Sequence, residues 1–126
     1  MKIILNVIFA LSSGSAFAST TNINCKINYI SIDGIGSIHA VQSVELSPFT
    51  YKKIPIGNFT LEVGLGGIAT ISTGEKYPVV SVQIFDNKFE AAQDGEVSVN
   101  PNYPAQASYQ ADESNESLNV SCTLAR

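Results

Sequence analysis

The chain has 126 residues, of which 44% are hydrophobic and 14% charged, and its formal net charge is −4. This hydrophobic share is typical of a globular protein and too high for a disordered one, and the length suits one domain. With 11 acidic against 7 basic residues, a nucleic-acid-binding surface is not expected. A single histidine leaves little room for a histidine-based metal site.

The first residues have the pattern of a secretory signal peptide. An apolar run follows the basic Lys2, and Ala16-Phe17-Ala18 provides the small-x-small pattern behind which a signal peptidase cuts. The apolar run is shorter than the roughly 20 residues that cross a bilayer. We therefore predict a signal peptide over residues 1–18, a single all-β domain over residues 19–126, a secreted or periplasmic location and no membrane span.

The remaining chain alternates apolar and polar residues with period two, which predicts half-buried β-strands. The stretch 49–57 lacks this alternation and is expected to be irregular, Gly66-Gly67 is expected to break a strand, and the Asp-Gly pairs at 33–34 and 94–95 are expected to form turns. In chain order, the expected strands cover residues 23–29, 38–46, 59–65, 68–72, 78–86, 96–99, 107–111 and 118–124.

The two cysteines are expected to form one structural disulfide. Cys25 and Cys122 lie on the apolar faces of the first and last expected strands, and their spacing is not that of a redox or metal-binding C-x-x-C motif. Short strands, frequent turns and the absence of helical periodicity predict an antiparallel β-sandwich or a small closed β-barrel with its terminal strands tied by this disulfide. Closure is slightly favoured, because it removes exposed strand edges.

No catalytic arrangement is apparent in the sequence. His39 is the single possible imidazole base, and its position on a strand favours a solvent-facing role. Glu45 and Glu62 are the best strand-borne carboxylates for glycoside chemistry, but acidic side chains on the polar face of a strand are ordinarily solvated. The polar run Asp112–Glu116 contains oxygen donors that suit Ca²⁺ without the spacing of an EF-hand, so calcium binding there is left open. We expect no enzyme, no cofactor and no metal.

One short segment resembles a known family. Ser72-Thr73-Gly74-Glu75-Lys76-Tyr77 is similar to the Ser-x-Gly-x-x-Tyr turn of the C-type lysozyme inhibitors, which are small exported β-barrels with a disulfide between their terminal segments. The resemblance implies that Ser72 and Tyr77 face a lysozyme cleft. The tryptophan-bearing strand that follows in that family is replaced here by Pro78-Val79-Val80, and no family assignment is made.

The function expected from the sequence is that of a non-catalytic binding or inhibitory module whose loops contact a protein or an envelope polymer. The alternatives are a structural or assembly component of the cell envelope, joined by strand addition through residues 59–65 if these form an edge, and a small hydrolase with an unrecognised site. A monomer is favoured over an oligomer by a small margin. The candidate contact residues are Asp33, Tyr51, Lys52, Lys53, Ser72, Tyr77, Asp112, Glu113 and Glu116.

Overall fold

A computed structural model of the chain describes residues 20–31, 37–89, 91–111 and 115–125. The predicted signal peptide lies outside these residues. The strands are β1 (Thr21–Ser31), β2 (Ile38–Leu46), β3 (Thr50–Ile56), β4 (Phe59–Thr70), β5 (Lys76–Asp86), β6 (Ala92–Ser98), β7 (Ala105–Ala111) and β8 (Glu116–Leu124). The described part of the chain contains no helix of the length and hydrophobicity that a membrane crossing requires.

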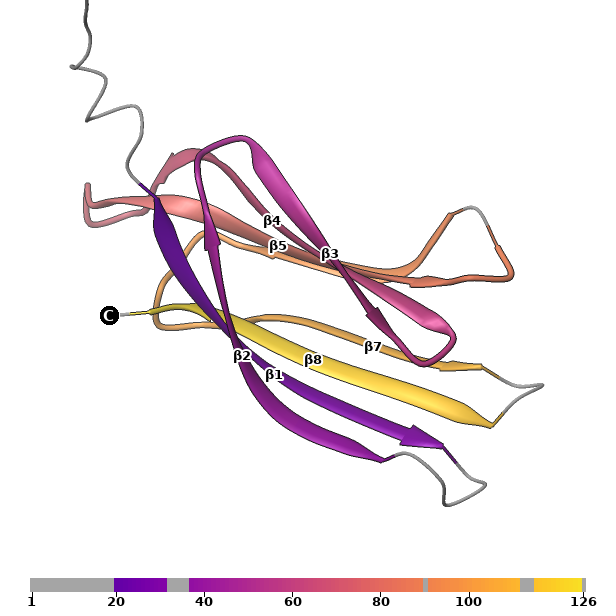
Figure 1. Cartoon of the computed structure of the whole chain (residues 1–126). Coiled ribbons are helices and arrows are strands. Elements are labelled where there is room, and N and C mark those ends of the chain that lie inside the picture. Colours follow the sequence, from indigo (N-terminus) through magenta and orange to yellow (C-terminus); the bar gives the residue numbers. More distant parts are fainter. Residues whose placement is uncertain (1–19, 32–36, 90, 112–114, 126) are drawn as a thin grey trace, which may run out of the picture.

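The strands form two four-stranded antiparallel sheets that pack face to face, with the orders β2-β1-β8-β7 and β3-β4-β5-β6 (Figure 1). Each sheet ends in two edge strands instead of continuing into the other sheet. Of the two expected architectures, the β-sandwich is therefore confirmed and the closed barrel is wrong. The closed form was favoured because it removes edges, and here the sheets keep their edges, three of which are protected by side chains, as described below.

The disulfide lies in the middle of the first sheet. The chain builds β1 and β2, crosses to make the sheet β3-β4-β5-β6 from consecutive hairpins, and returns to add β7 and β8, so that β1 and β8 become neighbours. In their antiparallel register Cys25 lies opposite Cys122, and the two residues are bonded through sulfur with their Cα atoms 4.0 Å apart. The predicted pairing is confirmed.

Two local predictions were wrong at the edges of the second sheet. Residues 49–57 are not irregular, because Thr50–Ile56 pair with β4; their alternation is hidden because β3 is an edge strand whose first four residues are exposed on both faces. The Asp94-Gly95 pair is not a turn but lies within β6, opposite Ile84 and Gln83.

Gly66 and Gly67 do not end a strand. Pairing with β5 continues through them with a shift in register, so β4 is one long strand containing a β-bulge, a place where glycine is common. β4 lies between β3 and β5. Strand addition through residues 59–65 is therefore excluded, because both edges of that strand are already occupied.

The core between the sheets is centred on Phe59, whose ring is flanked edge-to-face by Tyr29 at 6.1 Å and Tyr109 at 5.7 Å between centroids. Each tyrosine hydroxyl donates to a buried carboxylate. Tyr29 Oη lies 2.8 Å from Glu116 Oε1, and Tyr109 Oη lies 3.2 Å from Asp86 Oδ2. These bonds satisfy polar groups whose burial would otherwise be costly, and the Tyr109–Asp86 bond connects the two sheets.

Candidate functional site

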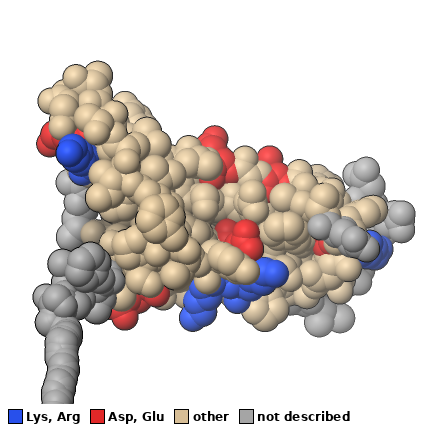
Figure 2. Space-filling view, turned by 90° about the horizontal axis from the view of Figure 1, so that it is seen from above, with Lys and Arg blue, Asp and Glu red and all other residues tan. Residues whose placement is uncertain are grey.

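Those predicted contact residues that the structure describes do not assemble into one site. Tyr51, Lys52 and Lys53 are exposed on β3, where the Lys53 ammonium group lies 5.9 Å from the centroid of the Tyr51 ring. Ser72 is exposed in the turn before β5, and Tyr77 is half-buried on β5, two strands away from β3. Seen from the side of the sheet β3-β4-β5-β6, charged side chains form small separate groups on a mostly uncharged surface (Figure 2).

The acidic candidates are distributed differently from the expectation. Asp33, Asp112 and Glu113 lie outside the described residues. Glu116 begins β8 and is buried, with a carboxylate that accepts hydrogen bonds from Tyr29 and, at 2.6 Å, from Asn58 Nδ2. Its carboxylate therefore faces the interior and connects β8 to the turn between β3 and β4.

The two strand-borne glutamates lie on opposite sides of the molecule. Glu45 is exposed between the buried Val44 and Leu46, on the outer face of the first sheet. Glu62 lies on the outer face of the second sheet, since its neighbours Leu61 and Val63 are buried. They cannot act together on one bond, and the described residues contain no group of three or more histidine, cysteine or acidic side chains that could hold a metal ion.

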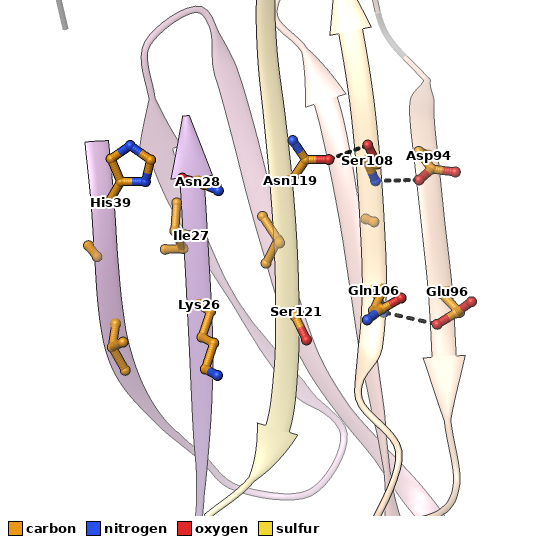
Figure 3. Close-up of a pocket in the computed structure, with 14 residues that line it drawn as sticks. Lys26, Ile27, Asn28, His39, Asp94, Glu96, Gln106, Ser108, Asn119 and Ser121 are labelled. Carbon is orange, nitrogen blue, oxygen red and sulfur yellow. Dashed lines mark hydrogen bonds between the residues drawn. The ribbon is translucent and has the colours of Figure 1, made fainter. Parts of the chain in front are cut away.

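A hollow of about 750 Å³, open to solvent, lies on the outer face of the sheet β2-β1-β8-β7 (Figure 3). This volume lies in the range of ligand-binding clefts. Sequence analysis did not identify it. Its polar lining comes from five strands: Lys26 and Asn28 of β1, His39 of β2, Asn119 and Ser121 of β8, Gln106 and Ser108 of β7, and Asp94 and Glu96 of β6.

Strand register arranges these side chains in two rows that cross the strands. One row runs His39, Asn28, Asn119, Ser108, and the other runs Val41, Lys26, Ser121, Gln106. Neighbouring strands are roughly 4.8 Å apart, and residues two positions apart along a strand are roughly 7 Å apart, which sets the spacing within and between the rows. We call Lys26, Asn28, Gln106, Ser108, Asn119 and Ser121 the amide face.

The carboxylates of β6 form one rim of the hollow and connect β6 to β7. Asp94 Oδ2 accepts a hydrogen bond from the backbone N–H of Ser108 at 2.6 Å, and Glu96 Oε1 accepts one from that of Gln106 at 2.9 Å (Figure 3). The hydroxyl group of Ser108 also donates to Asn119 Oδ1, which fixes the orientation of that amide. The two acidic side chains are thus engaged with backbone amides of the neighbouring sheet.

The residue types on this surface are unusual for strands. Asparagine is depleted in β-strands, yet Asn22, Asn24, Asn28 and Asn119 all occupy exposed positions on β1 and β8, the two central strands of the sheet. None of these side chains contributes to the core. Amides and hydroxyls both donate and accept hydrogen bonds, so the amide face can bind a ligand rich in the same groups.

Alternation in the sequence shows that these residues are polar and outward-facing. Alternation does not show that β8 lies beside β1, or that side chains of β6, in the other sheet, contact the backbone of β7. Comparisons of the chain with models of known families, with curated proteins and with solved structures find no match. The interpretation of the hollow therefore rests on its own chemistry.

Proposed function

We propose that this chain is a non-catalytic binding module that holds a polysaccharide chain, uncharged and rich in hydroxyl or acetamido groups, on the amide face. The observation that carries the proposal is the amide and hydroxyl side chains that lie in two rows across the three neighbouring strands β1, β8 and β7, within a hollow of about 750 Å³. Side chains on strands are held more rigidly than side chains on loops, which lowers the entropic cost of ordering them around a ligand.

The charged side chains that line the hollow favour an uncharged ligand. Lys26 is the single Lys or Arg among the lining residues, and the two lining carboxylates already accept hydrogen bonds from β7. A strongly anionic polymer would meet Asp94 and Glu96 at the rim, and a strongly cationic one would meet Lys26 in the floor. Hydroxyl and acetamido groups instead match the donors and acceptors of Asn28, Asn119 and Ser121.

An open hollow suits a polymer better than a small molecule, because an extended chain can lie along a row and continue past the edge strand β2. The predicted signal peptide and the disulfide between Cys25 and Cys122 support export to an oxidising compartment, where envelope polysaccharides are found. For inhibition of an enzyme, the other part of the expectation from the sequence, the described residues offer no comparable arrangement.

Binding of the oxidised protein to a panel of insoluble polysaccharides and soluble oligosaccharides, by pull-down and calorimetry, tests this proposal. Asn28→Ala combined with Asn119→Ala should weaken binding roughly thirtyfold, at about 1 kcal/mol for each of the two lost hydrogen bonds. Asn22→Ala is the matched control, because Asn22 is exposed on the same strand but does not line the hollow. Failure to bind any polysaccharide, or equal losses for Asn22→Ala and for the double variant, would contradict the proposal.

A further inference from the structure

The sandwich has four edge strands, and an edge strand exposes backbone N–H and C=O groups that can pair with another chain. Three of these edges carry protection. The carboxylates of Asp94 and Glu96 cap the outward N–H groups of β7, and the same two side chains place charge on the edge strand β6. On β3, Lys52 and Lys53 place charge on the edge, and Pro55 lacks a donor.

The fourth edge, β2, carries no such protection over the residues from Ile38 to Val44. This segment has no Lys, Arg, Asp, Glu, Pro or Gly, and its side chains from Ile38 to Val41 are exposed. Val41 is 72% exposed and Ile38 is 43% exposed. In Figure 1, β2 forms the free border of its sheet. Such an uncharged, partly apolar edge is suited to pairing with another strand.

The disulfide identifies which backbone groups of β2 point outward. A Cα–Cα distance of 4.0 Å is that of a non-hydrogen-bonded antiparallel pair, so the peptide groups of Cys25 point towards β2 and those of its partner Gln42 point back. By alternation, the N–H and C=O groups of His39, Val41 and Ser43 point away from the sheet.

The same alternation can be checked on β7. It directs the N–H groups of Gln106 and Ser108 outward, and these are the two groups that donate to Glu96 and Asp94. On β2, none of the described residues accepts a hydrogen bond from the outward N–H groups of His39, Val41 or Ser43.

We propose that β2 pairs antiparallel with β2 of a second copy of this chain about a two-fold axis, with Val41 opposite Val41 of the partner subunit. In this register His39 lies opposite Ser43 of the partner subunit, and the outward groups of these residues form the new hydrogen bonds. A second copy fits because the segment is self-complementary: it contains no like charges to repel, and Val41 meets its own equivalent across the axis.

The pairing closes at two copies. A two-fold contact uses the same surface on both subunits, and the other edges of each sandwich are protected, so no free edge remains for growth into a filament. His39 and Val41 also line the hollow. The partner subunit therefore extends the row of polar side chains across the axis. This inference concerns association of the protein alone and does not depend on ligand binding.

Analytical ultracentrifugation of the oxidised protein, over concentrations up to the millimolar range, tests the association. We expect a reversible dimer, because one strand pair forms a small interface. Val41→Lys should give a monomer, and so should Val41→Pro, which removes an outward N–H without breaking a bond to β1. Val97→Lys is the matched control: Val97 is 59% exposed on the protected strand β6, and its replacement should leave the dimer intact.

Amide hydrogen exchange of the unmodified protein tests the register without any variant. Protection of the amides of His39, Val41 and Ser43 should rise with protein concentration, while that of Gln106 and Ser108 should not change. A monomer at every concentration, or a dimer that survives both Val41 substitutions, would overturn the inference. Because polysaccharide is absent from these experiments, their outcome is separate from that of the proposed function.

Discussion

The hydroxyl group of Tyr29 donates a 2.8 Å hydrogen bond to the carboxylate of Glu116, a residue 87 positions later in the chain. Both side chains are buried, and Asn58 donates the second hydrogen bond to the same carboxylate. One acidic group thus joins β1, β8 and the turn between β3 and β4, at the end of the sandwich where β8 begins.

Tyr29→Phe should destabilise the protein by about 1–3 kcal/mol, because it removes a donor from a buried carboxylate while keeping the ring. Urea unfolding followed by circular dichroism measures this change. Tyr51→Phe is the control, since the Tyr51 side chain is 61% exposed and should lose little. Equal unfolding midpoints for the two variants would show that the Tyr29 hydroxyl does not stabilise the fold.

The same tyrosine leaves no space for a side chain at Gly57. Gly57 has a φ of 58°, and a Cβ atom added there would lie 2.5 Å from the Tyr29 ring. Gly74 also has a positive φ, 88°, but has no atom within 4 Å of such a Cβ. Gly74→Ala should cost about 1–2 kcal/mol for the backbone alone. Gly57→Ala should cost about 1–3 kcal/mol more for the steric conflict, and thermal unfolding of both variants gives the difference.

Loss of the disulfide should destabilise the protein strongly. It joins residues 97 positions apart, and removal of a native disulfide from a small exported domain typically costs about 2–5 kcal/mol. Replacing Cys25 and Cys122 together by alanine, and comparing the guanidinium unfolding midpoint with that of the oxidised protein, measures the effect. The oxidised protein treated with a reductant should show a similar loss, and resistance to both treatments would argue that the two sheets alone suffice for stability.

Removal of the β6 carboxylates should expose the edge of β7. Asp94→Ala with Glu96→Ala leaves the N–H groups of Ser108 and Gln106 without acceptors, and aggregation followed by light scattering should become faster. The control is Glu45→Ala with Glu75→Ala, which removes the same charge from positions away from β7. If both double variants aggregate equally, lost charge and not an exposed edge is the cause.

Phe49 is an exposed aromatic residue in a backbone conformation that favours glycine. Its φ is 62°, and its side chain is 81% exposed, so packing does little to offset the strain. Phe49→Gly should therefore raise the free energy of unfolding, by about 1 kcal/mol at most. Tyr103→Gly, at an exposed position without a positive φ, should give no such gain. Denaturant unfolding of the pair separates the two cases.

Sequence patterns predicted the parts of the fold that depend on local alternation. β1 and β8 have one face in the core along nearly their whole length, so their strands and the inward positions of Cys25 and Cys122 could be predicted. β3 could not, because the first half of this edge strand has no buried face. Gly95 was misread because Asp-Gly is a common turn pair, whereas here it lies on a strand edge beside Gln83.

The candidate site depended on information that a single sequence does not contain. Each residue of the amide face is an ordinary exposed polar residue in its own strand, and the rows exist only because β8 returns to lie beside β1. Glu116 was named as a candidate contact residue because it ends an acidic, polar run. Its burial comes from Tyr29 and Asn58, which are distant in sequence and were not identifiable as its partners.

The position of β8 between β1 and β7 also sets the order in which the two sheets can form during folding. The sheet β3-β4-β5-β6 consists of consecutive hairpins and can form as soon as its residues are available, since closing short loops is fast. β1 can pair with β2 in the same way, but its other edge must wait for β8, the last strand of the chain. We expect pulsed hydrogen exchange to show amides of β4 and β5 protected before those amides of β1 that point towards β8. During synthesis from the N-terminus, the sheet β2-β1-β8-β7 therefore stays incomplete until β8, the last strand, is available.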